Sequence, residues 1–430
     1  MKCRFCQNQL TNRFIDLGSA PPSNSFLTEQ QLNEPETFYP LKLHVCEKCW
    51  LVQTEEYKRA DEIFSRDYPY FSSYSTTWVE HAGIYVDMIV KKLGLNQNSQ
   101  VIEIASNDGY LLQYFQQRSI PCLGIEPAET AASVAGDKGI RVICDYFGTN
   151  LAAKLSGRGK SADLLIGNNV LAHVPDLNDF VDGLKVALKP HGAITMEFPH
   201  LMSLVEQNQF DTIYHEHFSY FSLHTVRTVF DAHGLELFDI EQLSTHGGSL
   251  RIYAKHKEDT SKAISPAVTK LIDQEARHEM FTLEYYQHFQ QKVDQTKYNI
   301  LSFLIEQKQQ KKKVIAYGAA AKGNTLLNYC GIKSDLIPFV VDASPHKQGR
   351  FLPGSHIPVT SEKEIHKLQP DYVLILPWNL SKEISTQLEY IRQWQGRFVV
   401  AVPKLEIFST KKDCCRYERI ITQTESVVIN

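Results

Sequence analysis

Apolar residues follow several patterns along the chain, and each pattern predicts a different kind of element. Residues 38–46 resemble a short strand, in a proline-containing stretch typical of a small module. Residues 78–95 place apolar side chains three and four positions apart, so we expect a helix that ends at Gly94. From residue 101 onward, short apolar runs alternate with helical segments, which is typical of a parallel, doubly wound sheet.

This alternation occurs twice, and a long, charged helical segment over residues 271–313 separates the two stretches. The first stretch has predicted strands at residues 101–105, 122–127, 142–145, 163–169 and 193–198, with helices that include 110–119, 128–139 and 177–190. The second stretch has strand-containing segments at residues 314–324, 336–349, 371–379 and 398–408. We therefore expect an α/β protein with a small module over residues 1–65, a Rossmann-like middle domain over 66–260, a second Rossmann-like domain over 261–408 and a tail over 409–430.

The composition narrows the class of protein further. The 430 residues include 45 basic and 49 acidic side chains, a formal net charge of −4, so no basic surface for nucleic acid is expected. No uncharged apolar run approaches the roughly 18 residues of a membrane span, and the amino terminus lacks the apolar stretch of a signal peptide. We therefore expect a cytoplasmic protein that binds neither nucleic acid nor membrane.

Four of the nine cysteines form two Cys-x-x-Cys pairs, Cys3 with Cys6 and Cys46 with Cys49. Two such pairs supply the four thiolates of a tetrahedral zinc site, and four protein ligands leave no open position for catalysis. The spacing therefore predicts a structural zinc. A redox dithiol, which needs only one pair, and free surface thiols are the alternatives.

Residues 101–112 predict a strand, a turn and the start of a helix, which is where sheets of this kind bind ligands. Gly109 lets the backbone approach a ligand, and Glu126 ends the next strand, where an acidic side chain accepts hydrogen bonds from a ribose diol. We expect a nucleoside cofactor to bind here. The alternative is that this turn binds no ligand and needs Gly109 only for folding. The candidate cofactor ligands lie in this turn or at strand ends: Asn107, Asp108, Gly109, Glu126, Asp145 and Asn168.

Residues 213–222, IYHEHFSYFS, concentrate two histidines, a glutamate and two tyrosines, which predicts a polar pocket. Histidine exchanges protons near neutral pH, a neighbouring glutamate can orient its ring, and a tyrosine can hydrogen-bond a developing oxyanion. Tyr214, Glu216 and His217 are therefore candidates for acid-base chemistry. There are two alternatives. One is a metal site, although the His-Glu-x-x-His pattern is not met. The other is a partly buried aromatic patch.

Further polar candidates lie at strand ends and glycine turns. His173 follows the predicted strand of residues 163–169, on the ligand side of the sheet. His246 and Arg251 flank a glycine turn that lets the backbone approach a ligand. In the last α/β stretch, Lys322 lies at a strand-to-helix turn that suits a diphosphate. Asn324 and Asn379 are further candidate donors there.

The order of these features resembles a known family. The motif EIASNDG, from Glu103 to Gly109, is similar to the first motif of class I S-adenosylmethionine methyltransferases, roughly E-x-G-x-x-x-G, with Ala105 at the middle glycine. The chain then has Tyr-His-Glu-His, His-Gly-Gly-Ser-Leu-Arg and Gly-Ala-x-x-Lys-Gly-Asn. Together with the four-cysteine module, this order resembles the sugar C-methyltransferases over almost the whole chain, to about Phe408.

The resemblance implies transfer of a methyl group from S-adenosylmethionine to carbon 3 of a nucleotide-linked (dTDP or GDP) 4-keto-deoxysugar, through an enolate. It implies that His217 is the base, that Tyr214 and Glu216 surround the sugar, and that His173 contacts the ketone or enolate. It implies that S-adenosylmethionine binds to Glu103 and to the cofactor ligands named above. It also implies that the sugar nucleotide binds to Lys322, Asn324, His246, Arg251 and Asn379. We expect a monomer that holds one structural zinc.

Two other classes of protein stay open at this point. One is a non-catalytic scaffold built from two nucleotide-binding folds. The other is an NAD-dependent enzyme that modifies sugar nucleotides, which the absence of a Gly-x-Gly-x-x-Gly fingerprint disfavours.

Overall fold

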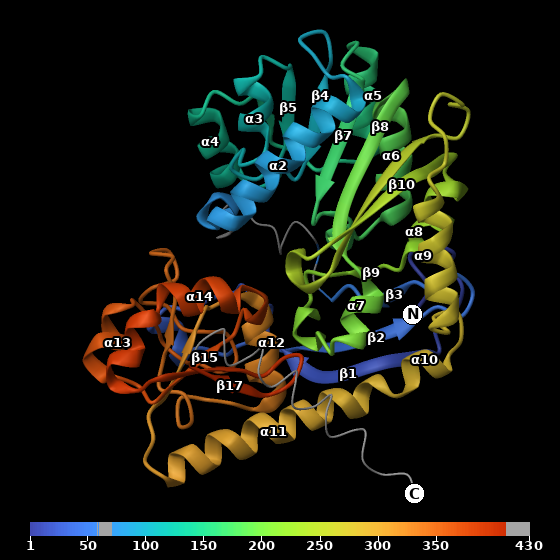
Figure 1. Cartoon of the computed structure of the whole chain (residues 1–430). Coiled ribbons are helices and arrows are strands. Elements are labelled where there is room, and N and C mark those ends of the chain that lie inside the picture. Colours follow the sequence, from blue (N-terminus) through green and yellow to red (C-terminus); the bar gives the residue numbers. More distant parts are fainter. Residues whose placement is uncertain (58, 60–70, 410–430) are drawn as a thin grey trace, which may run out of the picture. The chain divides into compact units, whose positions relative to one another are not determined.

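The computed structural model describes residues 1–57, 59 and 71–409, and Figure 1 shows their helices and strands. The chain divides into two compact units that alternate along the sequence. The first contains residues 1–16, 42–204 and 215–288, and the second contains residues 17–41, 205–214 and the chain from residue 289 onward. The predicted domain boundary near residue 65 and the tail after residue 409 lie outside the described residues.

A four-stranded sheet in the order β1-β2-β3-β9 combines strands from the start and the middle of the chain. Its strands are β1 (Asn12–Ala20), β2 (Tyr39–Val45), β3 (Val52–Thr54) and β9 (Ser219–Tyr220). Strand β3 pairs antiparallel with β9, so that Val52 lies opposite Tyr220 and Gln53 opposite Ser219. The cysteine-rich module therefore shares a sheet with the segment that follows the His-Glu-His motif.

The seven-stranded sheet of the first unit has the order β10-β11-β8-β7-β4-β5-β6. Its strands are β4 (Val101–Ile104), β5 (Cys122–Ile125), β6 (Val142–Ile143), β7 (Ala162–Asn168), β8 (Leu188–Pro199), β10 (Leu235–Leu243) and β11 (Ser249–His256). Strands β4 to β8 are parallel, as the alternation predicts. Strands β10 and β11 form an antiparallel hairpin on β8, which the sequence pattern did not reveal.

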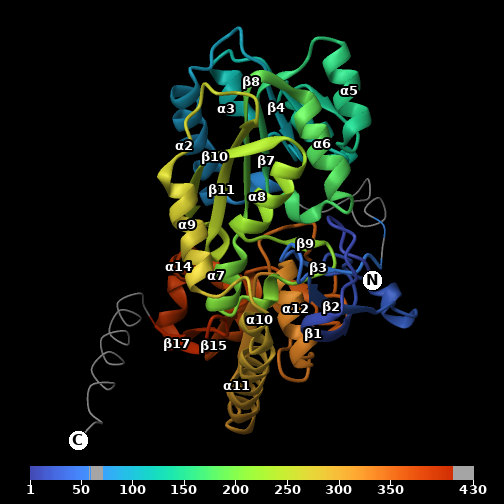
Figure 2. The same cartoon turned by 90° about the vertical axis from the view of Figure 1, so that its right-hand side faces the viewer.

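Helices cover both faces of this sheet (Figures 1 and 2). One face carries α2 (Thr76–Leu93), α3 (Leu112–Gln117) and α4 (Glu129–Asp137), and the other carries α5 (Thr149–Gly157) and α6 (Leu177–Ala187). Two further helices, α7 (Leu201–Glu206) and α8 (Leu223–Ala232), follow β8 and β9. Helix α2 ends, as predicted, at Gly94 in the left-handed conformation.

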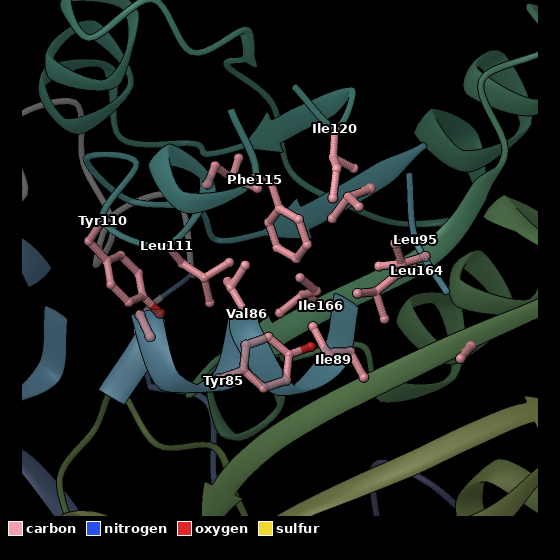
Figure 3. Packing of buried hydrophobic residues seen from close by; sticks show 14 of the residues in the cluster. Tyr85, Val86, Ile89, Leu95, Tyr110, Leu111, Phe115, Ile120, Leu164 and Ile166 are labelled. Atoms are coloured by element: carbon pink, nitrogen blue, oxygen red, sulfur yellow. The ribbon is translucent and has the colours of Figure 1, made fainter. Parts of the chain in front are cut away.

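The core between α2 and the sheet fixes the position of β4. Tyr85, Val86 and Ile89 of α2 pack with Phe115 of α3 and Ile166 of β7 (Figure 3). All five side chains are almost completely removed from solvent. Their apolar burial is the main favourable term that holds the β4–α3 turn in place.

The second unit contains a six-stranded sheet in the order β14-β13-β12-β15-β16-β17, as the second α/β alternation predicts. Its strands are β12 (Val314–Tyr317), β13 (Val340–Val341), β14 (Val359–Thr360), β15 (Tyr372–Ile375), β16 (Arg397–Val400) and β17 (Glu406–Phe408). Its helices include α12 (Ala321–Cys330), α13 (Lys363–Leu368) and α14 (Ser381–Gln387). Only β17 is antiparallel to its neighbour, β16.

The predicted helical segment over residues 271–313 is divided into α9 (Pro266–Arg277), α10 (Glu284–Gln287) and α11 (Phe289–Gln309). Glu279 interrupts the helix because it adopts a left-handed conformation, with φ of 58°. Short 3-10 helices are η1 (Gln30–Asn33), η2 (Ser72–Tyr74), η3 (Leu171–His173), η4 (Phe210–Thr212), η5 (Thr245–Gly247), η6 (Trp378–Leu380) and η7 (Glu389–Trp394). Within the part of the chain that the structure describes, no helix combines the length and apolarity needed to cross a bilayer.

The turn after β4 has an unusual backbone. Ala105, Asn107 and Gly109 all have positive φ angles, of 56°, 49° and 76°. Ala105 therefore adopts the left-handed conformation that suits the glycine usual at this place in the motif, at a cost of roughly 1–2 kcal/mol for a residue with a Cβ atom. At Gly109, three residues before α3 begins, a Cβ atom would lie 2.4 Å from Cδ1 of Ile140, so the Ile140 side chain would have to shift.

We predict that Gly109→Ala lowers the free energy of unfolding by about 1–3 kcal/mol, because it combines backbone strain with a clash against Ile140. The matched control is Gly136→Ala in α4, where a Cβ atom meets nothing within 4 Å. That change should be neutral or stabilising by up to about 1 kcal/mol. Urea unfolding of both variants measures the difference, and equal effects would contradict the clash.

Candidate active site

The turn between β4 and α3 lies at the carboxyl edge of the sheet, and backbone amides organise it. One carboxylate oxygen of Glu126, which follows β5, accepts a hydrogen bond from the Asn107 amide at 2.9 Å. The other accepts from the Ala128 amide, also at 2.9 Å. The side chain of Asn107 in turn accepts from the Ser72 amide at 2.8 Å. These bonds fix Glu126 in the position where the sequence predicts a ribose-binding carboxylate.

Three buried carboxylates, those of Glu103, Asp108 and Glu126, act on one another in this region. Burial, followed by the charges of Glu126 and Asp108, raises the pKa of Glu103 well above its usual range, and the Tyr110 side chain only partly offsets this. Among the described residues, Oδ1 of Asp108 accepts no hydrogen bond, while Lys138 lies 3.5 Å from Oδ2. A cationic ligand would stabilise this acidic group.

The remaining predicted cofactor ligands, Asn168 and Asp145, lie in different surroundings. Asn168, at the end of β7, donates to the Tyr110 hydroxyl at 3.3 Å and so lies beside the β4–α3 turn. Asp145, after β6, is exposed, and its side chain accepts a hydrogen bond from the amide of Tyr146 at 2.8 Å. Asn168 thus lies with the acidic group, whereas Asp145 lies at the solvent-exposed end of the edge strand β6.

A buried ionic network lies at the end of β8, and the sequence reasoning missed its centre, Glu197. Its carboxylate accepts from Nη2 of Arg251 at 2.7 Å, from the Thr245 hydroxyl at 2.9 Å, and contacts Nε2 of His81 at 2.9 Å. Nη1 of Arg251 also binds Glu241 at 2.6 Å. The predicted substrate ligand Arg251 is therefore held inside the protein by two carboxylates. A glutamate close to the end of a predicted strand, AITMEF, was the available signal.

His246, the other candidate in the glycine turn, is brought to the carboxyl edge of the sheet. Its Nε2 accepts a hydrogen bond from Nδ2 of Asn169 at 2.9 Å. Its ring centre lies 5.0 Å from that of Trp78, which in turn stacks at 5.1 Å on His81. The glycine turn thus joins the ligand side of the sheet, close to the buried ionic network.

His173 and His217 form an adjacent pair in the first unit. Their ring centres are 4.6 Å apart and the rings meet edge to face. Nδ1 of His173 lies 2.8 Å from the carbonyl oxygen of Glu216, and because a carbonyl only accepts, Nδ1 must carry the proton. Burial lowers the pKa of His173 to about 4, so at neutral pH the ring is uncharged and Nε2 carries a lone pair.

The His-Glu-His motif lies on a turn that continues into β9. Glu216 and His217 are buried, and the His217 ring also lies 5.9 Å from that of Tyr220. Tyr214 belongs to the second compact unit and is half-buried. Among the described residues, the side chains that cluster as metal ligands are the four cysteines.

The four cysteine sulfurs lie within 4.8 Å of one another. Cys3 and Cys49 are 3.6 Å apart and Cys6 and Cys46 are 3.5 Å apart, close to the roughly 3.8 Å edge of a tetrahedron with Zn–S distances of about 2.3 Å. Both knuckles close with the same backbone hydrogen bond, from Gln7 to Cys3 and from Trp50 to Cys46. The donor set and its geometry fit a structural zinc, and the ion would fix the two knuckles to each other.

In the second unit, Lys322 lies at the start of α12 with its candidate partner Asn379. Its Nζ donates to Oδ1 of Asn379 at 2.9 Å and lies 5.0 Å from the ring centre of Trp378. The Trp378 indole N–H donates to Asp211 at 2.8 Å. Burial raises the pKa of Asp211 to about 6, which the charge of Lys322 opposes, and burial lowers the pKa of Lys322. Sequence reasoning missed Asp211 because its partner is 167 positions away.

The other predicted donor of this unit, Asn324, points elsewhere. It is 1% exposed, and its Nδ2 donates to the carbonyl oxygen of Ser23. Asp342, after β13, accepts from the Ala319 amide at 2.7 Å and lies 3.5 Å from Nζ of Lys347. Lys322 and Asn379 therefore form one polar group, whereas Asn324 fixes the helix to the segment around Ser23.

Comparisons with known proteins agree with this layout. Three family profiles match the chain. They describe a zinc binding domain at residues 3–64, a methyltransferase domain at residues 80–240 and a C-methyltransferase C-terminal domain at residues 244–403. The C-methyltransferase NovU of Streptomyces niveus is 32% identical over 410 residues, which cover 95% of this chain and 97% of that protein.

Solved methyltransferase structures match part of the chain at low identity. An S-adenosylmethionine-dependent methyltransferase from Clostridium acetobutylicum is 11% identical, with 41% of this chain and 92% of that chain covered and a TM-score of 0.34. Magnesium protoporphyrin IX methyltransferase from Synechocystis, with bound S-adenosylhomocysteine, is 15% identical, with 41% and 82% covered and a TM-score of 0.34.

The four-thiolate site and the family profiles define an S-adenosylmethionine-dependent methyltransferase with a structural zinc. The chain belongs to the C-methyltransferase family, as its likeness to NovU over almost its full length shows. This assignment favours the methyltransferase interpretation over the scaffold and over the NAD-dependent enzyme.

We predict that the neutral state of His173 makes stability depend on pH. Because its folded pKa, about 4, lies below the usual 6.5, the unfolded chain takes up this proton first, and stability is lost as the pH falls from 6.5 through 4. Between pH 7 and pH 5 the loss is about 2 kcal/mol. His173→Asn keeps a donor for the Glu216 carbonyl and removes this loss. Urea unfolding of both proteins at the two pH values tests it, and an identical pH dependence would contradict it.

Proposed function

We propose that the protein methylates carbon 3 of a nucleotide-linked 4-keto-deoxysugar, carried by dTDP or GDP, in the biosynthesis of unusual deoxysugars. The observation that carries this proposal is the adjacent His173–His217 pair, in which His217 is buried and His173 half-buried, because methylation at carbon requires a base that first removes a proton. A ketone next to that carbon acidifies the hydrogen. S-adenosylmethionine supplies an electrophilic methyl group, whose sulfur leaves as a neutral thioether.

His217 is the proposed base, and His173 supports it electrostatically. When His217 takes up the substrate proton, its ring becomes positively charged. His173, with its pKa lowered to about 4, stays neutral at 4.6 Å and adds no repulsion. Its lone pair on Nε2 can accept a hydrogen bond from the sugar or from a protonated neighbour. Tyr214 and Glu216 are proposed to contact the sugar beside the base.

Lys322 and Asn379 are the proposed ligands of the diphosphate. Lys322 lies at the amino-terminal end of α12, a helix of ten residues, where the backbone amides and the helix dipole favour an anion. Its side chain is half-buried, and desolvation lowers its pKa. An anionic ligand would compensate this cost, which the Asp211 charge and the Trp378 ring already offset in part. His246, Arg251 and Asn324 are weaker candidates, because each side chain already has a partner inside the protein.

We predict that His217→Asn reduces turnover on a 4-keto-deoxysugar nucleotide by at least about 100-fold, because general base catalysis contributes roughly that factor. Binding of S-adenosylhomocysteine, measured by calorimetry, should stay within a few-fold of wild type. The matched control is His191→Asn, whose side chain is 81% exposed. Near-normal turnover by His217→Asn would refute the base assignment.

We predict that Lys322→Gln raises KM for the sugar nucleotide by about 10-fold or more, since a charge-assisted hydrogen bond contributes roughly 1.5–3 kcal/mol. The KM for S-adenosylmethionine should not change. Lys404→Gln, a change at a lysine 60% exposed in the same unit, is the control. A KM for the sugar nucleotide that matches wild type would show that the diphosphate binds elsewhere.

A further inference from the structure

Arg4, inside the first Cys-x-x-Cys pair, contacts both segments that carry the paired histidines. Its Nη1 donates to the carbonyl oxygen of Pro175, two residues after His173, at 2.8 Å. Its guanidinium lies 5.4 Å from the ring centre of Phe218, the residue after His217. We propose that Arg4 is a positioning residue for the His173–His217 pair and transmits the rigidity of the zinc site to it; this inference rests on the proposed function.

The two histidine segments have little secondary structure of their own. His173 ends η3, which has three residues, and His217 precedes β9, which has two. They are joined by the hydrogen bond from the Phe218 amide to the Ala172 carbonyl, at 2.8 Å. Short elements of this kind gain their stability from tertiary contacts, so the spacing of the two rings depends on what holds residues 175 and 218.

Arg4 holds these segments from a position that the cysteines determine. Its backbone amide donates to Oε1 of Gln53 at 2.8 Å, and Nε2 of Gln53 donates to the sulfur of Cys3 at 3.2 Å. The first regular strand of the chain begins only at Asn12. The first knuckle is therefore joined to the second by the metal-binding thiolates and by the hydrogen bonds of Arg4 and Gln53, so the position of Arg4 depends on the zinc site.

The geometry requires a guanidinium. Nη1 donates to Pro175 while Nη2 donates to the Thr54 carbonyl at 2.7 Å, and the same plane covers the Phe218 ring. The Thr54 amide donates to the Phe218 carbonyl at 3.1 Å, so Thr54 and Phe218, which both contact the Arg4 guanidinium, are joined where β3 pairs with β9. A lysine offers a single charged nitrogen and cannot make both hydrogen bonds in one plane. Arginine thus links three backbone segments at once.

The decisive experiment compares Arg4→Gln and Arg4→Lys with Arg13→Gln, a control in the same module whose side chain is 62% exposed. Arg4→Gln should keep one zinc per chain and wild-type affinity for S-adenosylhomocysteine. Its kcat should fall about 10- to 100-fold with an unchanged KM for S-adenosylmethionine, as is typical when support behind a reacting group is lost. Arg4→Lys should recover part of the loss.

A second readout does not depend on turnover. The proton on Nδ1 of His173 is buried in its hydrogen bond to Glu216, and its exchange with solvent can be followed by NMR of histidine-labelled protein. Loosening of the segment should make this exchange about 10-fold faster in Arg4→Gln and leave it unchanged in Arg13→Gln. A role confined to folding would lower the melting temperature without changing exchange under native conditions.

Wild-type kcat together with wild-type exchange in Arg4→Gln would overturn the proposal. If Arg4→Gln loses its zinc, Arg4→Lys decides: full zinc with full kcat would overturn it, and full zinc with reduced kcat would support it. If wild-type protein methylates no keto-deoxysugar nucleotide, the proposed function fails, while faster exchange in Arg4→Gln still supports the positioning role and unchanged exchange overturns it.

Discussion

The parallel alignment of strands β4, β5, β7 and β8 is the constraint on which the site in the first unit depends. Because all four strands end at one edge, residues far apart in sequence meet there, including Glu103, Glu126, Asn168 and Glu197. The edge then divides by charge. Around the β4–α3 turn the charges of Glu126 and Asp108 raise the pKa of buried Glu103, whereas at β8 Glu197 is neutralised by Arg251. The first group keeps uncompensated acidic side chains, and the second is a structural ion network.

The two histidines need contacts outside the sheet to fix their positions, because they lie on loops beyond its strands. The β3–β9 pairing and the cysteine-rich module supply it from the other side of these loops. In this account a zinc site without an open coordination position still influences the reaction, since it determines where the loops lie. A small module that cannot build a large core uses metal ligands for stability, and here the same ligands hold a residue that touches both loops.

The sequence allowed the α/β class, the zinc ligands and the neighbourhood of Glu126 and His217 to be predicted, because these depend on local patterns. Strand periodicity and Cys-x-x-Cys spacing are properties of a few consecutive residues. The roles of Arg251 and Asn324 could not be predicted in the same way. Whether an arginine binds a substrate or neutralises a buried carboxylate depends on a partner such as Glu197, more than 50 residues away, which only the tertiary fold brings near.

The paired histidines are proposed to serve carbon methylation of a keto-deoxysugar nucleotide. The most direct measurement is to incubate the zinc-loaded enzyme with S-adenosylmethionine and a dTDP- or GDP-linked 4-keto-6-deoxysugar, and to analyse the nucleotide sugar by mass spectrometry and carbon NMR. The account predicts one added methyl group, bonded to carbon 3 of the sugar. A methyl group found on oxygen or nitrogen, or no methylated sugar with either carrier, would contradict it.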